Sequence, residues 1–305
     1  MQKVVENIVA SIGRVLIGKD QQIKLALACL LARGHLLIED LPGMGKTTLA
    51  QGLANALGLS FNRVQFTSDL LPADVVGVSV YDRNCGKFDF HPGPIFSQLL
   101  LADEINRTTP KTQSALLEAM AERQVTVDGK TRSLPDTFFV IATQNPLNQS
   151  GTFPLPESQL DRFLMRIELG YPHPQAERDL LAGGDPRHLL KSIQPLIKPD
   201  QLTTIQNKVD DIQSTDALID YLQRLVQYTR DESLFHHGLS PRAALGALQA
   251  AKAWALMQGR KHVIPEDIQA VFPSIASHRL LSATEATGFA SDALIDQVLA
   301  SVDTI

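Results

Sequence analysis

The amino-acid sequence predicts an α/β domain with a mostly parallel sheet, followed by a smaller domain made only of helices. In the first half, short apolar runs alternate with helical patterns, which is typical of parallel strands joined by crossover helices. From about residue 200 the pattern is helical throughout. The segment Tyr171-Pro-His-Pro174 interrupts the pattern between the two parts. We therefore predict an α/β domain at residues 1–171 and a helical domain at residues 172–305.

Five apolar runs are the expected strands of the sheet. They lie at residues 36–39, 62–66, 98–103, 138–142 and 165–169. The runs at 98–103 and 138–142 are continuously apolar, as in strands that helices cover on both faces.

Helices are expected between these strands and throughout the second domain. In the first domain they lie near residues 21–32, 47–57 and 111–122. Ser240-Pro241 and Pro265 each mark the start of a long helix of the second domain, since proline is favoured in the first helical turn.

Two short hairpins interrupt the alternation of strands and helices. The first has arms at 78–81 and 87–90, and the second has arms at 124–127 and 130–134 around Asp128-Gly129. Asp-Gly between alternating residues is a strong hairpin signal. Such an insertion is either an ornament or a projection that contacts a substrate or a neighbouring chain.

The segment from Leu36 to Thr48 carries the clearest chemical signal. An apolar strand leads into the loop Leu-Pro-Gly-Met-Gly, then Lys46-Thr47, then a helix, which is the context that a phosphate-binding loop requires. Lys46 would contact the β- and γ-phosphates, and the hydroxyl of Thr47 would bind Mg²⁺. Asp40 replaces the first glycine of the strict motif, and Asp tolerates turn conformations. The predicted nucleotide contacts here are Pro42, Gly43, Met44, Gly45, Lys46, Thr47 and Thr48.

A second signal is the pair of acids at the end of the strand at 98–103. In open α/β sheets, ligands bind at the carboxyl ends of the strands, so these acids would meet the phosphates there. Asp103 is expected to hold Mg²⁺, through water, and Glu104 to polarise the attacking water as general base. The predicted cofactors are therefore ATP and Mg²⁺.

These motifs resemble AAA+ ATPases, and the MoxR family of their helix-2-insert branch most closely. Asp103-Glu-Ile-Asn-Arg107 resembles the second signature of AAA+ proteins, and Ala142-Thr-Gln-Asn-Pro146 their first sensor. The MoxR resemblance lies in the segments 67–74 and 155–163, and in the positions of the two hairpins. It covers nearly the whole chain and implies a P-loop NTPase core with a helical lid.

The resemblance implies further site residues. Asn145 would position the attacking water, and Arg162 would be the arginine finger that reaches the γ-phosphate of an adjacent subunit. Arg242 resembles the second sensor on a lid helix, and Ile17-Gly18 the segment that contacts adenine. Three alternatives stay open: Arg162 forms an ion pair with Asp161 or Glu157, Arg166 is the trans-acting arginine, and Arg242 is a solvated residue at a helix start.

Composition limits the class of protein. The net charge is −5, whereas a general nucleic-acid binder usually carries a basic excess. No apolar stretch approaches the length of a membrane helix, and no signal peptide pattern is evident. Cys29 and Cys85 are too few for a disulfide framework or a complete zinc site. We expect a cytoplasmic protein without membrane insertion.

The resemblance implies a homo-oligomeric ring, a hexamer, that hydrolyses Mg-ATP to remodel or mature a protein client, with a separate von Willebrand factor A domain protein as partner. One alternative is a nucleic-acid motor of the same branch. The hairpin charges disfavour it, because Arg83, Lys87, Lys130 and Arg132 are nearly balanced by Asp82, Asp89 and Asp128. A second alternative is a nucleotide-dependent assembly switch, in which turnover is incidental.

Overall fold

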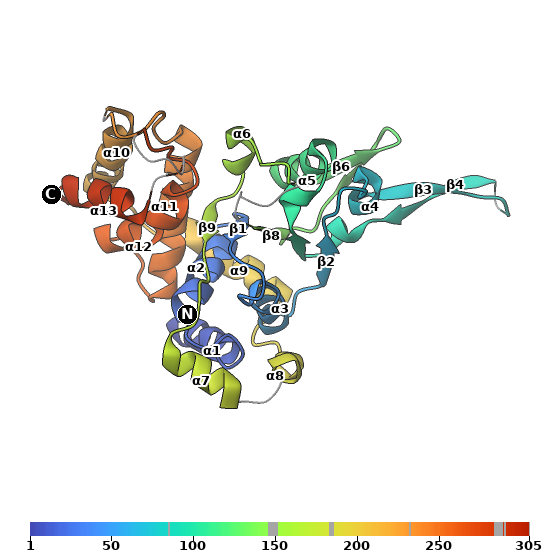
Figure 1. The fold of residues 1–305 in the computed structure, drawn as a ribbon, viewed down its shortest axis with the longest axis horizontal. Coiled ribbons are helices and arrows are strands. Elements are labelled where there is room, and N and C mark those ends of the chain that lie inside the picture. Colours follow the sequence, from blue (N-terminus) through green and yellow to red (C-terminus); the bar gives the residue numbers. More distant parts are fainter. Residues whose placement is uncertain are drawn as a thin grey trace.

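The structure is a computed structural model that describes residues 1–84, 86–145, 152–182, 186–231, 233–283, 289 and 291–304. Cys85 and Pro146, which belong to two of the segments singled out above, lie outside these residues. The α/β part lies in the middle of the molecule, with the helices that follow residue 215 at one end and a long hairpin projecting at the other (Figure 1).

Five parallel strands form the sheet, in the order β2-β5-β8-β1-β9. The five predicted strands are confirmed, with shifts of at most two residues at their ends. Their bounds are β1 Leu36–Glu39, β2 Phe61–Gln65, β5 Leu99–Asp103, β8 Phe139–Gln144 and β9 Met165–Ile167.

Both faces of the sheet are buried, and alternate residues of its strands belong to two separate apolar clusters. Leu36 and Ile38 join one cluster, whereas Leu37 between them joins the other. Successive side chains of a strand point to opposite faces, so a strand covered on both sides must be apolar at every position. This explains the continuous apolar runs of β5 and β8.

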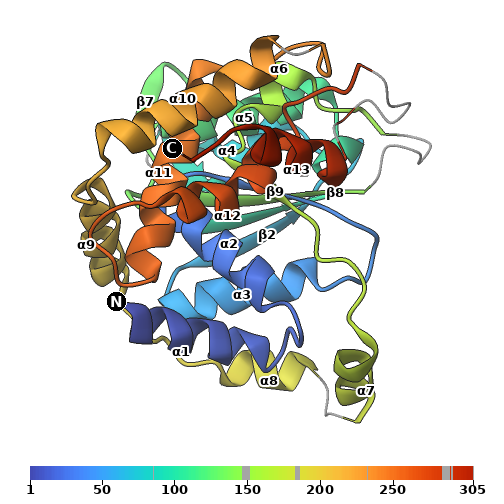
Figure 2. The same cartoon turned by 90° about the vertical axis from the view of Figure 1, so that its left-hand side faces the viewer.

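Helices of the first half cover the two faces. The first three helices belong to the cluster of Leu36, on one face, and α4 and α5 to the cluster of Leu37 (Figure 2). The bounds are α1 Gln2–Gly13, α2 Asp20–Leu31, α3 Lys46–Leu57, α4 Pro72–Val76, η1 Pro94–Phe96, η2 Ile105–Arg107, α5 Pro110–Glu122 and α6 Glu157–Leu160.

The second half is helical, as predicted, and it shares a core with the first half. Helix α2 packs against β1 and β9, and also against α9 and α11, so one apolar cluster continues across residue 171. Cys29 lies in this cluster as a buried free thiol. None of the helices in the described residues has the length and apolarity to span a bilayer. The bounds are α7 Pro174–Ala182, α8 Pro186–Ser192, α9 Pro199–Asp210, α10 Asp216–Asp231, α11 Pro241–Met257, α12 Pro265–Ala276 and α13 Asp292–Ser301.

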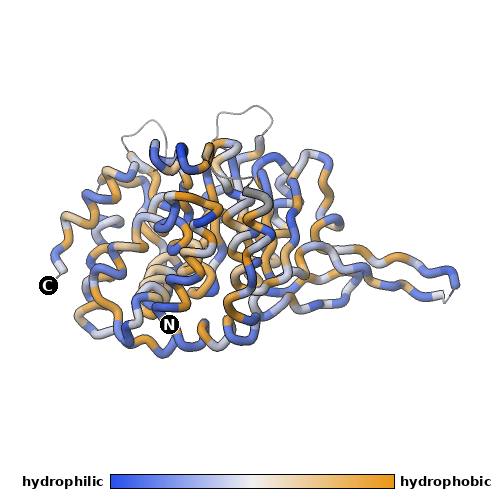
Figure 3. The backbone as a smooth tube through the Cα atoms, turned by 90° about the horizontal axis from the view of Figure 1, so that it is seen from below, coloured by the Kyte–Doolittle hydropathy of each residue, from blue (hydrophilic) through white to orange (hydrophobic). Residues whose placement is uncertain are grey.

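Both predicted hairpins are present. The first pairs β3 Gly77–Asp82 with β4 Lys87–Pro92, and the second pairs β6 Gln124–Val127 with β7 Lys130–Ser133. The first one extends far from the body, with a hydrophilic tip (Figure 3). At its base, Phe90 packs edge-on against Phe96, and the guanidinium of Arg132 lies 3.8 Å from the Phe90 ring centroid. This contact joins the two hairpins.

Candidate active site

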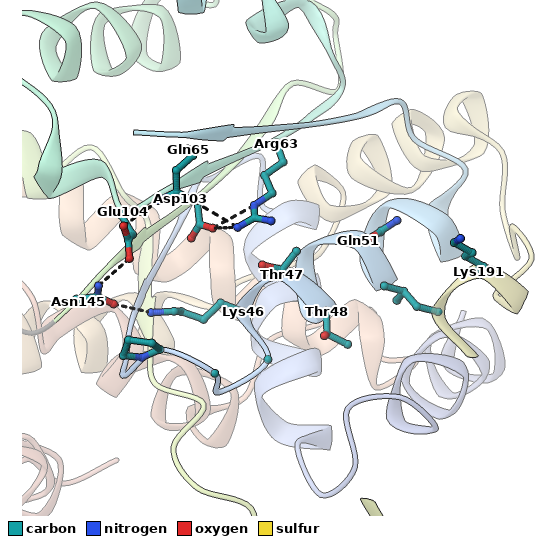
Figure 4. Close-up of a pocket in the computed structure, with 14 residues that line it drawn as sticks. Lys46, Thr47, Thr48, Gln51, Arg63, Gln65, Asp103, Glu104, Asn145 and Lys191 are labelled. Carbon is teal, nitrogen blue, oxygen red and sulfur yellow. Dashed lines mark hydrogen bonds and ion pairs between the residues drawn. The ribbon is translucent and has the colours of Figure 1, made fainter. Parts of the chain in front are cut away.

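A cavity of about 640 Å³ opens at the carboxyl ends of the strands (Figure 4). It is bordered by the loop after β1, the ends of β2, β5 and β8, and one turn of α8. Most of the predicted site residues line it: Pro42, Gly43, Gly45, Lys46, Thr47, Thr48, Asp103, Glu104 and Asn145. Gln51, Arg63, Gln65, Leu190 and Lys191 complete the lining.

The loop between β1 and α3 depends on two glycines in the left-handed region of the backbone. Gly43 has φ +89° and Gly45, the N-cap of α3, has φ +95°. A β-carbon on Gly45 would lie 2.7 Å from Leu16 Cδ1, so a side chain there would also displace Leu16. The first turn of α3, with Lys46 and Thr47, therefore presents unpaired amides and the positive end of its dipole to the cavity, as an anion site requires.

Lys46 is buried at the base of the cavity. Its Nζ donates to the backbone oxygen of Asp40 at 2.6 Å and to Asn145 Oδ1 at 3.2 Å. Burial lowers the pKa of Lys46, and the charges of Asp40, Asp103 and Glu104 oppose that shift. Several acids thus compensate an ammonium group that faces the place expected for phosphate.

Asp103 is held by two donors, neither of which the sequence analysis predicted. Thr143 Oγ1 donates to its Oδ1 at 2.6 Å. Arg63 donates to its Oδ2 from Nη2 at 2.6 Å and from Nε at 3.1 Å. Arg63 lies on β2, the edge strand next to β5, where Gln65 is in register with Asp103. Arg63 therefore balances the charge of the predicted metal ligand.

Glu104 follows β5 in a left-handed conformation, with φ 57° and ψ 49°. A residue with a side chain reaches this region at a cost of about 1 kcal/mol, and such residues cluster at functional sites. Its Oε1 accepts from Asn145 Nδ2 at 3.0 Å, and its Oε2 from Gln65 Nε2 at 2.8 Å and from Arg107 Nε at 3.1 Å. A continuous chain of polar contacts thus runs from Lys46 through Asn145 to Glu104.

The oxygen donors of the cavity fit a divalent cation that arrives with phosphate. Thr47 offers a hydroxyl and Asp103 a carboxylate on the same cavity wall. Within the described residues there is no group of three or more His, Cys, Asp or Glu side chains that could hold a metal by itself. Mg²⁺ bound to nucleotides typically uses one or two protein oxygens and takes its other ligands from phosphate and water.

The structure gives a physical reason for Asp40 in place of the expected glycine. Its backbone is outside the left-handed region, so turn tolerance does not explain it. Instead, Oδ2 accepts from the amides of Leu169 and Gly170, each at 2.7 Å, and Oδ1 accepts from the amide of Leu41 at 2.8 Å. The carboxylate links the phosphate loop to the segment that leaves β9.

Comparisons with known proteins agree with this geometry. Residues 35–165 match the model of the ATPase family associated with various cellular activities (AAA), and residues 227–298 match the AAA lid domain. Chaperone MoxR1 of Mycobacterium tuberculosis is 38% identical over 97% of this chain and 81% of its own length. The chain belongs to the MoxR family of AAA ATPases. ATP binding and hydrolysis follow from this membership.

Two further similarities extend over the whole of this MoxR-family chain. YeaC of Bacillus subtilis is 45% identical over 96% of this chain and 92% of its own. A crystal structure of a Cytophaga hutchinsonii protein has a TM-score of 0.89 and 35% identity, over 99% of this chain and 95% of that one. The predicted α/β core with two hairpins and a helical lid is therefore confirmed.

Two predicted site residues of the MoxR-family chain, Arg162 and Arg242, lie away from the cavity. They line a separate depression of about 280 Å³, together with Arg33 and Arg123, which shares no lining residue with the main cavity. We call it the arginine depression. It also contains Gly34 and His35, which precede β1, and Leu164, which precedes β9. It therefore lies at the amino ends of the strands, at the opposite edge of the sheet from the phosphate loop.

The alternatives for these arginines are partly resolved. Arg166 pairs with Glu39 at 2.9 Å and with Glu168 at 3.0 Å, so its guanidinium is engaged within its own chain. The carboxylate of Asp161 pairs with Arg279 at 2.7 Å rather than with Arg162. Among the described residues, no ion pair includes Arg162 or Arg242.

The remaining predicted nucleotide contacts do not line the main cavity. Gly18, with φ +74°, lies against His173 and Ala176 at the start of α7. Ile17 precedes it, and Met44 packs at the edge of the larger apolar cluster. Their contact with adenine stays a prediction.

Proposed function

We propose that this chain hydrolyses Mg-ATP as part of a homo-oligomeric ring, and that each site is completed by arginines from a neighbouring chain. The observation that carries the proposal is the position of Arg162 and Arg242 at the opposite edge of the sheet from the phosphate loop. The length of strand β1, about 13 Å, lies between the two edges. Neither arginine is placed to reach a phosphate held by Lys46 of its own chain.

Within one chain, the geometry supplies the other parts of the reaction. The amides of the phosphate loop and Lys46 would bind the β- and γ-phosphates. Glu104 would accept a proton from the attacking water, and the Asn145 amide would orient that water. In the structure Gln65 and Arg107 occupy one oxygen of Glu104, so water would need to approach the other oxygen or displace one of these donors.

Thr47 and Asp103 are the residues that would hold Mg²⁺. The ion would neutralise charge on the phosphate oxygens. Arg63 already neutralises Asp103 in the structure, so Arg63 would release that carboxylate, or share it through water, when a cation is present.

A mixing experiment tests the shared site. Arg162→Ala and Glu104→Gln are each expected to lower turnover at least about 10²-fold, since Arg162 would act on the γ-phosphate and Glu104 on the attacking water. Combined in equal amounts, the two inactive variants should recover part of the activity, because some sites then have an intact Glu104 beside an intact Arg162. Arg224→Ala, an exposed arginine of α10, is the control and should keep full activity.

Two results would overturn the shared site. One is an Arg162→Ala variant with full turnover. The other is a turnover per chain that does not change with protein concentration over the range in which wild type associates. The nucleotide cavity would then act within a single chain, as in an assembly switch.

We further propose that the ring remodels a protein client, together with a separate von Willebrand factor A domain protein. The support is the similarity to a protein named Chaperone MoxR1, the net charge of −5 and the nearly balanced charges of the hairpins. Turnover should rise on addition of the client and respond little to DNA. DNA-stimulated turnover that falls steeply with salt would instead favour a nucleic-acid motor.

A further inference from the structure

We propose that Arg279 is a positioning residue for hydrolysis, which fixes Arg162 and Arg242 as one unit through the turn at residues 161–164. The inference rests on the proposed function, since it concerns how the two arginines are presented to a neighbouring site. Arg279 lies just after α12, in the lid, whereas the turn belongs to the α/β part.

Arg162 lies in a turn that has little support from its own segment. It follows α6, a helix of only four residues, and its amide donates to Gln159 O at 3.2 Å. The loop before α6 is irregular over residues 152–156. The direction of the Arg162 side chain therefore depends on what holds the turn from outside.

Arg279 supplies that support with four of the five donors of its guanidinium, and the fifth donates within the lid, to Ile275 of α12. Nε donates to Asp161 Oδ1 at 2.7 Å. Nη2 donates to the backbone oxygens of Asp161 at 3.2 Å and Phe163 at 2.6 Å, and Nη1 to those of Leu164 at 3.1 Å and Ile275 at 2.6 Å. An arginine has five N–H donors in a rigid plane, and all five are used here. Lysine has three donors at a single point and cannot reproduce this pattern.

His278 adds a second contact from the lid to the same turn. Its Nε2 lies 3.0 Å from Phe163 O, and burial lowers the pKa of His278 well below its usual value. The ring is therefore neutral, with Nε2 as the donor. Phe163 O accepts from both His278 and Arg279, which occupies both of its lone pairs.

Asp161 connects this contact to Arg242. Ser240 Oγ lies 3.4 and 3.5 Å from the two Asp161 oxygens, and it also accepts from the amide of Ala243 as the N-cap of α11. Arg242 lies in the first turn of that helix. One carboxylate thus joins Arg279, the Arg162 turn and the helix start that carries Arg242.

The side chain of Leu164 lies against the backbone of two glycines, one in each part of the chain. A β-carbon on Gly34, before β1, would lie 2.3 Å from Leu164 Cδ2, and one on Gly246, in α11, would lie 2.7 Å from Leu164 Cδ1. The turn therefore lies in close contact with the core on one side and with the lid on the other.

A purely structural ion pair is the competing explanation for Arg279. Buried charge pairs are weak evidence for stability, since the cost of desolvation offsets the attraction. The two explanations differ in what the Arg279→Lys variant loses. A positioning role predicts lost turnover with intact ATP binding in the main cavity, whereas a structural role predicts a general loss.

The test is a double-mutant cycle on turnover. Arg279→Lys is expected to lower kcat about 10²-fold, as a displacement of about 1 Å can do, and to leave the affinity for ATP within about twofold. In an Arg162→Ala, Arg242→Ala background the same change should have no further effect. The control is Arg260→Lys, which alters a different arginine–aspartate pair, with the buried Asp267 of the lid, that does not touch the turn. It should leave kcat unchanged.

Each outcome decides between the alternatives. An additive loss in the Arg162→Ala, Arg242→Ala background would overturn the positioning role. So would an active Arg279→Lys beside an inactive Arg162→Ala, and the shared site would then stand without it. A fully active Arg162→Ala would instead remove the proposed function itself. If Arg279→Lys does not fold, Asp161→Asn replaces it, because it keeps an acceptor but loses the charge that joins Arg279 to Ser240.

Discussion

A histidine at the base of the sheet makes folding sensitive to acid. His35 is buried, its Nδ1 accepts from the amide of Val140 at 3.0 Å, and its Nε2 faces Met120 O at 3.4 Å. Burial, helped by the charges of Arg123 and Arg242, lowers the pKa of His35 to about 4. Protonation at Nδ1 would remove its role as acceptor and place a charge in the core.

The pKa shift of His35 sets the direction of the pH dependence. The pKa in the folded state, about 4, lies below the value of 6.5 expected for the unfolded chain, so the unfolded chain binds the proton more readily. The stabilisation is therefore complete above about pH 6.5 and is lost as the pH falls towards 4. This contribution of His35 to the free energy of unfolding amounts to about 3 kcal/mol. We expect His35→Asn to be less stable than wild type at pH 7, and to lose less free energy of unfolding between pH 7 and pH 4.5.

Denaturant unfolding at several pH values measures this difference. His237→Gln, which changes an exposed histidine, is the control and should follow wild type at every pH. A His35→Asn variant with the same pH slope as wild type would show that other groups dominate the acid sensitivity.

Residues that act within one short segment could be predicted, whereas residues that act across strands could not. Lys46, Thr47, Asp103 and Glu104 follow from a glycine-rich loop and from acids at a strand end. Arg63 was missed because it reaches Asp103 from a neighbouring strand. The contact requires β2 to pair with β5, with Gln65 beside Asp103. The only local signal was the polar composition of β2, which is unusual beside the apolar β5.

Two phenylalanines on the same face of the first hairpin have different surroundings. Phe90 lies at the base, against Phe96 and Arg132, while Phe88 is 72% exposed further out and pairs with Tyr81. We expect Phe90→Ala to destabilise the hairpin by about 2 kcal/mol, because it removes both apolar contact and a cation–π contact. Phe88→Ala should change it by less than about 0.5 kcal/mol.

Hydrogen exchange of the amides at 77–92 reports this difference directly. A loss of about 2 kcal/mol corresponds to roughly 30-fold faster exchange, if these amides exchange by local opening. Phe88→Ala is the matched control on the same strand. Equal exchange in the two variants would mean that the contact with Arg132 does not hold the hairpin in place.

At the scale of elements, the type and position of the five strands, of both hairpins and of the long lid helices were predictable, whereas α1, α4 and the order of the strands were not predicted. The strands, the long lid helices and both hairpins follow from local periodicity, proline and Asp-Gly signals. The order β2-β5-β8-β1-β9 depends on contacts between distant segments, and no pattern within one segment encodes it. The placement of Arg162 at the edge of the sheet opposite Lys46 follows from its position just before β9, whereas the position of Arg242 beside it depends on how α11 packs.

The whole molecule presents its phosphate loop and its arginine depression on different faces, which has a consequence for association. A nucleotide bound at Lys46 would attract Arg162 and Arg242 of another copy, so ATP should promote assembly. We expect Glu104→Gln to form larger particles with ATP than without nucleotide, and ADP to have a weaker effect because it lacks the γ-phosphate. Sedimentation velocity measures this change.

Two variants distinguish a loss of nucleotide binding from a loss of the contact between chains in that experiment. Lys46→Ala should show no response to ATP, because the nucleotide is not held. The Arg162→Ala, Arg242→Ala variant should bind ATP but remain small. A particle size that is the same with and without ATP in all of them would mean that assembly does not use the γ-phosphate.

The apolar cluster that continues from the sheet into α9 and α11 has a mechanical consequence. Densely packed interiors have low compressibility and transmit strain. A chain whose two parts share one interior moves as a stiff body rather than as two bodies on a hinge. In an assembly of such chains, the interfaces between chains would deform more easily than the chains themselves. Work drawn from a nucleotide would then appear as rotation of whole subunits against one another.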